Sequence, residues 1–199
     1  MQRIPRLLLI IDGMGDRPII ELGGKTPLQA ANLPVLDQLA KEGQCGIADP
    51  VKPGIVATTV LGTLAILGYD PLNNSVARGV VEALGCGMEI KPGDVAFRGN
   101  WATLDEKGII VDRRAGRIRE DTKELSASLC GVKIDDVCVN VGAGTEHRVA
   151  VVICGAGLKD CISGSDPGDH FSSGIKPRHA VPLNKNDKKS LRTAKLLNL

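Results

Sequence analysis

The stretch that decides the fold is Leu7–Asp16, LLLIIDGMGD, in which five aliphatic residues lead directly into an aspartate. A continuous apolar run of this length is typical of a buried central strand in a parallel sheet, here residues 7–11. Ligands of open α/β sheets bind beyond the carboxyl ends of such strands. Asp12 lies at that end. The sequence therefore predicts either a divalent-metal ligand there or a carboxylate that hydrogen-bonds the following turn.

The composition is that of an ordinary globular chain of 199 residues, with 43% hydrophobic and 24% charged residues. Aromatic residues make up only 2%, so a nucleic-acid platform of stacked rings is not expected. The net charge of +2 is too small for a general binder of polyanions. The sequence contains no run of 18 apolar residues, so no membrane span is expected. The six cysteines contain no CxxC pair, which indicates reduced thiols in a cytoplasmic protein.

The order of the patterns predicts three sections. Residues 1–70 are typical of part of a doubly wound α/β domain, with the strand at 7–11 followed by a helix opened by Pro34 and closed by Gly43. A short strand and turn follow within 44–54, and then a helix over 59–67. Residues 71–180 predict an α+β domain. It contains helices within 75–88 and 119–132, a hairpin turning at 105–108 and two strands within 135–155. Residues 181–199 predict a helix that leaves this domain.

Two groups of residues outside the first strand favour phosphate chemistry. A threonine hydroxyl at a helix N-terminus, Thr58 or Thr59, is either a simple cap or, beside a metal, an acceptor for a phosphoryl group. Arginine forks match phosphate and carboxylate oxygens in two-pronged geometry, although a charge run is also typical of a solvated face. The arginines in question are Arg98, Arg113, Arg114, Arg117, Arg119 and Arg148.

A third group combines EHR at 146–148 with SDPGDH at 165–170. Asp166, Asp169 and His170 are candidates for another anion or metal site. The alternative is an Asp-Pro-Gly turn beside a histidine whose hydrogen bonds are satisfied within the fold.

Taken in order, these motifs resemble one family across nearly the whole chain. LLLIIDGMGDRP, LGGKTPLQAAN, DPVKPG, LAILGYDP, ARGVVEALG, DVAFRGNWAT, DRRAGRI and EHRVAVV are similar to the archaeal-type, cofactor-independent phosphoglycerate mutases of the alkaline phosphatase superfamily. The resemblance implies a partial alkaline-phosphatase-like doubly wound sheet with an inserted α+β cap domain. It also implies interconversion of 3-phosphoglycerate and 2-phosphoglycerate without 2,3-bisphosphoglycerate.

The resemblance also implies roles for particular residues. Two divalent metals, Mn²⁺, Mg²⁺ or Zn²⁺, activate a hydroxyl nucleophile in this family, so Asp12 becomes a metal ligand and Thr59 both a metal ligand and the nucleophile. The substrate is a small phosphorylated acid. The residues expected to line its side of the site are Arg98, Arg113, Arg114, Arg117, His147 and Arg148.

Two departures from the family pattern leave alternatives open. Val60 and Thr63 stand where the family carries an aspartate and a histidine after its nucleophile. The chain is also shorter than the family, which leads us to expect a truncated product whose site is completed by a homo-oligomer or a missing C-terminal half. The alternative functions are a catalytically silent module that binds phosphorylated acids and another phosphatase-superfamily enzyme, such as a phosphopentomutase or phosphonoacetate hydrolase.

Overall fold

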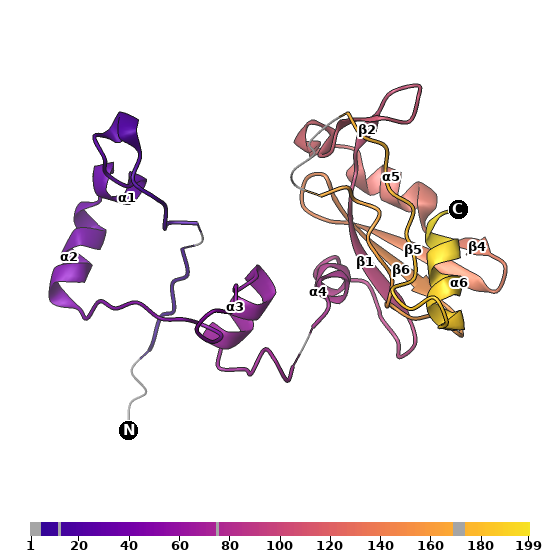
Figure 1. The fold of residues 1–199 in the computed structure, drawn as a ribbon, viewed down its shortest axis with the longest axis horizontal. Coiled ribbons are helices and arrows are strands. Elements are labelled where there is room, and N and C mark those ends of the chain that lie inside the picture. The colour runs from indigo at the N-terminus through magenta and orange to yellow at the C-terminus, as the bar shows by residue number, and fades with distance from the viewer. Residues whose placement is uncertain (1–4, 12, 75, 169–173) are drawn as a thin grey trace. The chain divides into compact units, whose positions relative to one another are not determined.

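The structure is a computed structural model that describes residues 5–11, 13–74, 76–168 and 174–199. The chain divides into two compact units, residues 1–49 and residues 50–199 (Figure 1). The helices of the described ranges are all too short or too polar to cross a bilayer.

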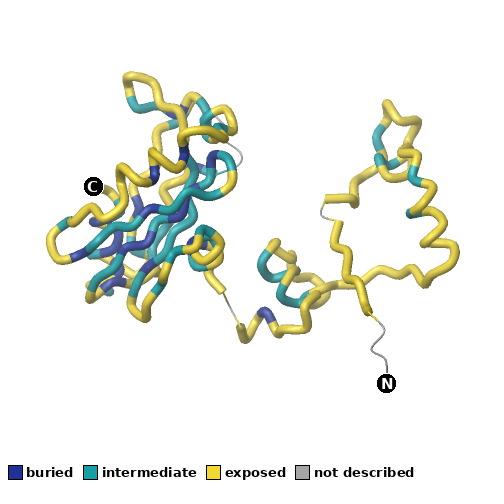
Figure 2. The backbone as a smooth tube through the Cα atoms, turned by 180° about the vertical axis from the view of Figure 1, so that it is seen from behind, coloured by how far each residue is buried: buried dark blue, intermediate teal, exposed yellow. Residues whose placement is uncertain are grey.

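The first unit is built from short helical segments. These are the 3-10 helix η1 (Ile20–Leu22) and the helices α1 (Pro27–Ala30) and α2 (Pro34–Glu42). A capping box begins α1, because the Thr26 hydroxyl accepts from the Gln29 N–H while the Gln29 side chain accepts from the Thr26 N–H. The helix expected between Pro34 and Gly43 is confirmed as α2. None of the described residues of this unit is buried (Figure 2).

The strand expected over Leu7–Ile11 is wrong for this structure. These residues form no strand and are exposed, from 90% at Leu7 to 45% at Ile11. A strand needs a neighbour to pair its N–H and C=O groups. Among the described residues of the first unit, only the bridge between Ile19 and Lys25 pairs extended backbone. The short strand expected within 44–54 does not form either, and that segment is irregular backbone with a bend and a turn.

The second unit centres on a four-stranded antiparallel sheet. Its strands are β1 (Val95–Asn100), β4 (Val132–Ile134), β5 (Val137–Ala143) and β6 (Arg148–Cys154), in the order β1-β6-β5-β4. The small strands β2 (Thr103–Leu104) and β3 (Ile110–Asp112) pair separately around a turn at Asp105–Gly108, as the sequence predicts. The fold is therefore mixed α and β. Both sheets formed by the described residues are antiparallel, so the doubly wound sheet expected from the sequence is not seen among them.

The four α-helices described in the second unit match the sequence patterns closely, whereas its 3-10 helix was not predicted. The helices are α3 (Thr59–Ile66), α4 (Arg78–Gly85), the 3-10 helix η2 (Ala115–Arg117), α5 (Thr122–Leu129) and α6 (Lys188–Leu197). Helix α4 approaches β1 so closely that a Cβ at Gly79 would overlap the Ala96 carbonyl and lie 2.8 Å from the Phe97 Cα. This contact explains why the helix carries a glycine at that position.

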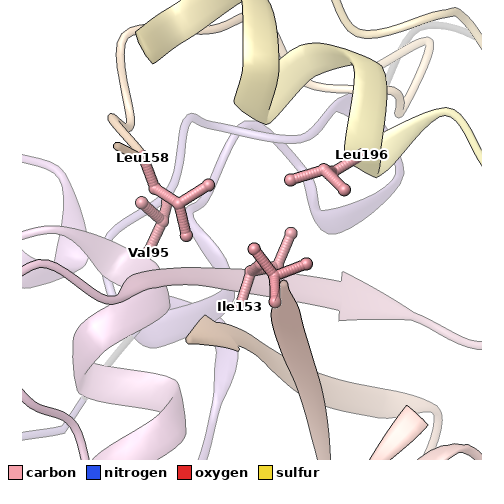
Figure 3. Packing of buried hydrophobic residues seen from close by; sticks show 5 residues of the cluster. Val95, Ile153, Leu158 and Leu196 are labelled. Atoms are coloured by element: carbon pink, nitrogen blue, oxygen red, sulfur yellow. The ribbon is translucent and has the colours of Figure 1, made fainter. Parts of the chain in front are cut away.

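The sheet buries apolar side chains on both of its faces. Since side chains alternate along a strand, Val95 and Ile153 lie on one face and their neighbours Ala96 and Val152 on the other. The first face packs Val95, Val137 and Ile153 with Leu158 and with Leu196 of α6 (Figure 3). The second face packs Ala150 and Val152 against Ala83 of α4. The terminal helix thus belongs to the core of this unit and does not leave it, because Leu196 is 91% buried there.

Candidate functional site

The arginine-rich segment predicted to bind an anion is a loop fixed by one aspartate. Asp112 ends β3, and its carboxylate accepts from the N–H groups of Arg114 at 2.8 Å and Gly116 at 2.6 Å. These backbone hydrogen bonds, led by that from Arg114, lower the pKa of Asp112 below its ordinary value. Three successive residues, Ala115 to Arg117, have positive φ between 44° and 64°. Asp112 therefore holds a tight, left-handed loop of residues 113–117, here called the arginine loop. It carries three of the predicted arginines, Arg113, Arg114 and Arg117.

Arg113 of this loop forms a bidentate ion pair with Asp166. Its Nε lies 2.8 Å from Oδ1 and its Nη2 lies 2.6 Å from Oδ2. The Arg113 guanidinium is the main reason that the pKa of the Asp166 carboxyl lies below its usual range. Asp166 also accepts from the Gly168 N–H at 2.9 Å, as the Asp-Pro-Gly turn interpretation expects. The other two members of that predicted group, Asp169 and His170, lie outside the described residues.

The turn between β5 and β6 supplies the second half of the site. Gly144 donates to the Arg148 carbonyl at 3.0 Å, and Glu146 takes a left-handed φ of 55°. The Glu146 carboxylate accepts from Arg119 at 2.8 Å and 3.2 Å. A hollow of about 480 Å³ lies beside this turn, lined by Arg119, Glu146 and the first turn of α5. The ion pair between Arg119 and Glu146 therefore connects Arg119 to the turn between β5 and β6.

Two nitrogens beside this turn are buried without a hydrogen-bond partner. They are His147 Nδ1 and Trp101 Nε1, among the described atoms. The two residues are neighbours, because the backbone N–H of Trp101 donates to the backbone carbonyl of His147 at 2.7 Å. Among the residues that the structure describes, Glu146 brings a carboxylate oxygen to 4.0 Å from His147 Nδ1. An unpaired buried nitrogen costs about 1–3 kcal/mol, so both point to a polar partner from solvent or a ligand.

The remaining predicted arginines differ in their surroundings. Arg98 forms an ion pair with Glu82 of α4, with 3.1 Å between Nε and Oε2, and both side chains are about four-fifths buried. Arg148 begins β6 opposite Asn100 and is half-buried. Arg114 and Arg117 are exposed. The structure thus pairs Arg113 with Asp166, and Arg119 with Glu146 beside His147, and it leaves the side chains of Arg114 and Arg117 exposed to solvent.

The predicted phosphoryl acceptor lies at the start of α3. The Thr58 hydroxyl accepts from the Leu61 N–H at 3.4 Å, so Thr58 is the helix cap. Thr59 is the first residue of the helix and is exposed. Val60 and Thr63 follow it on the same helix. The second residue of this predicted centre, Asp12, lies outside the described residues.

The described residues do not form a two-metal centre. In the described ranges, no three His, Cys, Asp or Glu side chains gather closely enough to hold a metal ion. Thr59 alone would supply one neutral oxygen, whereas Mg²⁺ and Mn²⁺ sites use several carboxylate, carbonyl or water oxygens. We therefore derive no catalytic step through a metal from these residues.

Sequence reasoning left some participants of the site open or without a role. For Asp166 it left open an anion or metal site and an Asp-Pro-Gly turn; the turn forms, and the Asp166 carboxylate also pairs with Arg113. Asp112 and Glu146 position the loop and the turn through contacts that sequence spacing does not reveal. Trp101, the sole tryptophan of the chain, lies in the motif DVAFRGNWAT, but that motif assigns it no role.

Comparison with known proteins identifies the family. The family model for 2,3-bisphosphoglycerate-independent phosphoglycerate mutase matches residues 40–199. Mutases of this name from Methanobrevibacter smithii and Picrophilus torridus are 44% and 48% identical to the chain, each over 96% of it, and each match covers 46% of the relative. The solved cofactor-independent phosphoglycerate mutase of Thermoplasma acidophilum matches with a TM-score of 0.58 and 40% identity, over 95% of this chain and 48% of that one. The chain belongs to the family of 2,3-bisphosphoglycerate-independent phosphoglycerate mutases.

The chain spans about half the length of the curated relatives it matches. The family model and the identities confirm the resemblance seen in the sequence at the level of the family.

Proposed function

We propose that this chain supplies the cap and part of the catalytic domain of a phosphoglycerate mutase that interconverts 3-phosphoglycerate and 2-phosphoglycerate. The reaction is an isomerisation by intramolecular phosphoryl transfer, in the cytoplasm, without 2,3-bisphosphoglycerate. The observation that carries the proposal is the family match over residues 40–199, which includes the whole arginine loop and the β5–β6 turn.

The arginine loop is the part that we propose binds the substrate. Arg114 and Arg117 are exposed on a loop whose backbone Asp112 already fixes, so they reach an anion at little ordering cost. Phosphoglycerate carries a phosphate and a carboxylate, and guanidinium forks bind both in two-pronged geometry. We assign Arg98, Arg113, Arg148 and His147 to the same side, with His147 Nδ1 as the group that would bond a substrate oxygen.

Thr59 is the proposed nucleophile. Its hydroxyl oxygen would attack the phosphorus of 3-phosphoglycerate, and the bond from phosphorus to the 3-oxygen would break, with a proton returning to that oxygen. The 2-hydroxyl of the reoriented glycerate would then take the phosphoryl group back and free the threonine. Because Thr58 serves as the helix cap, the Thr59 hydroxyl is the better candidate of the two.

Two divalent ions, Mn²⁺, Mg²⁺ or Zn²⁺, are the cofactors we propose for the whole enzyme, with Asp12 and Thr59 among their ligands. One carboxylate and one threonine are too few for two such ions. The further ligands would come from beyond the described residues, either from a second copy of the chain or from a C-terminal half like that of its relatives.

The same proposal accounts for the exposed N-terminal segment. We propose that residues 1–70 belong to an alkaline-phosphatase-like doubly wound domain and residues 71–180 to the cap. Residues 181–199, whose helix α6 packs on the cap, would form the segment that leads back toward that domain. Leu7–Ile11 would then become a central strand only when partner strands are supplied. Until then five aliphatic side chains stay exposed, an arrangement that favours association with another chain.

A second candidate function is a catalytically silent module that binds phosphorylated acids. Val60 and Thr63 favour it, because neither can replace an aspartate or a histidine in acid–base or metal chemistry. The lack of a metal-binding group in the described ranges also favours it. This candidate keeps the arginine loop as the functional site and removes the role of Thr59.

Calorimetric titration of the purified chain with 3-phosphoglycerate, with and without Mn²⁺, and a coupled assay for 2-phosphoglycerate test both candidates. If a second copy of the chain completes the metal site, the mutase proposal expects turnover that Thr59→Ala abolishes and Arg114→Ala strongly reduces. If a C-terminal half completes it, the proposal expects Mn²⁺-dependent binding without turnover by the purified chain. Thr58→Ser, which keeps the cap, is the matched control and should retain activity. Binding without turnover, independent of Mn²⁺ and lost in Arg114→Ala, would establish the silent module. No binding to the chain would overturn the assignment of the arginine loop.

A further inference from the structure

Three cysteines converge on one amide in the second unit. The Sγ atoms of Cys130 and Cys138 each lie 3.8 Å from Asn140 Oδ1, and Asn140 Nδ2 lies 3.5 Å from Cys154 Sγ. All six cysteines of the chain are free thiols. None of these three belongs to the arginine loop or to the turn that carries His147.

Two of the three face each other across neighbouring strands. In the register of β5 and β6, Cys138 pairs directly with Cys154, and Asn140 pairs with Val152. Directly opposed residues of an antiparallel pair have Cα atoms about 4.5–5.5 Å apart. That range lies within the roughly 4.4–6.8 Å that disulfides span. The side chains of opposed residues leave the sheet on the same side, so the register places both thiols on one face of the hairpin.

The surroundings of the pair allow a reagent to reach it. Cys138 and Cys154 are half-buried at the end of the hairpin away from the turn, while Cys130, just after α5, is exposed. The contacts of all three thiols to Asn140 are long and weak. The Cys154 thiol also hydrogen-bonds the Asp94 carboxylate, and this partner must be released when Cys154 reacts.

We propose that Cys138 and Cys154 are a thiol–disulfide modification site, oxidised by small-molecule disulfides while the chain stays folded. The Cys138 thiolate attacks one sulfur of the small disulfide, a mixed disulfide forms, and one small thiolate leaves. The Cys154 thiolate then attacks the Cys138 sulfur and expels the second small thiolate. The two protons of the protein thiols end on the two released thiols. The protein loses two electrons, and the small disulfide gains them.

Tryptic mapping tests the proposal, because each thiol falls in a separate peptide. Cleavage after Lys and Arg places Cys138 in residues 134–148, Cys154 in residues 149–159 and Cys130 in residues 124–133. The reduced folded chain is incubated with oxidised glutathione, its remaining thiols are alkylated, and the digest is weighed. The expected product is peptide 134–148 joined to peptide 149–159, lighter by two hydrogen atoms than their sum. It should dominate over every other linkage.

Variants and a denatured sample separate the site from general thiol reactivity. Cys138→Ser and Cys154→Ser should each abolish the product, whereas Cys161→Ser, half-buried but outside the cluster, should leave its yield unchanged. In urea, the product should lose its dominance among the linkages of six cysteines. The proposal is overturned if the folded wild-type chain forms only glutathione adducts, links Cys130 to Cys138 instead, or does not react.

Discussion

Replacing Leu196 by alanine should strongly destabilise the second unit. Leu196 of α6 is 9% exposed and packs with Val95, Val137, Ile153 and Leu158 (Figure 3). The change removes three carbons, worth about 2.4 kcal/mol at roughly 0.8 kcal/mol for each buried CH₂. A term for the cavity brings the expected loss in unfolding free energy to about 3–4 kcal/mol.

Leu191→Ala is the matched control on the same helix. Leu191 is 44% exposed, so its truncation should cost about 1 kcal/mol or less. Both changes alter helix propensity equally, and their difference therefore isolates burial. Urea unfolding followed by tryptophan fluorescence measures it, because the only tryptophan, Trp101, lies in the second unit. Equal losses in the two variants would refute the conclusion that α6 belongs to the core.

Three further predictions concern backbone contact and charge. Gly79→Ala should cost at least about 1–3 kcal/mol in the same unfolding measurement, because its Cβ would overlap β1, whereas Gly85→Ala has open space and should be neutral or stabilising. The ion pair and hydrogen bond from Lys159 lower the pKa of Asp187 to about 2, below its unfolded value of about 3.9. Its contribution to stability is therefore complete above about pH 4 and lost toward pH 2, and Asp187→Asn should flatten unfolding curves recorded across that window. Arg113→Lys should raise the carboxyl pKa of its partner in an NMR titration, since a lysine cannot form the bidentate pair; an unchanged pKa would contradict the assigned cause.

Local patterns predicted the helices because their signals are local. Thr58 before the apolar run at 59–67 marked a helix start, and Pro34 and Gly43 marked both ends of α2. The hairpin at 105–108 followed from alternation and a turn. Each of these elements is determined by residues within one or two turns of one another.

The sequence reasoning failed where an element depends on a distant partner. Leu7–Ile11 has the composition of a buried strand, but composition does not supply the neighbouring strand that such a segment requires. The same limit applies to the site. Sequence patterns identified the arginines as candidates, but the pairing of Arg113 with Asp166 joins residues far apart in the chain. The direct opposition of Cys138 and Cys154 likewise depends on strand register, which residue types alone do not fix.

The ion pair between Arg113 and Asp166 has a consequence for how an anion would enter the site. Asp166 holds both of its oxygens against the fork of Arg113, in the geometry that a substrate carboxylate or phosphate would adopt. At Arg113, unlike at the exposed Arg114 and Arg117, an incoming anion would therefore exchange with a resident carboxylate. Such an internal competitor keeps the guanidinium oriented before the ligand arrives. It also sets a threshold, because only an anion that binds the fork better than a single aspartate will displace it.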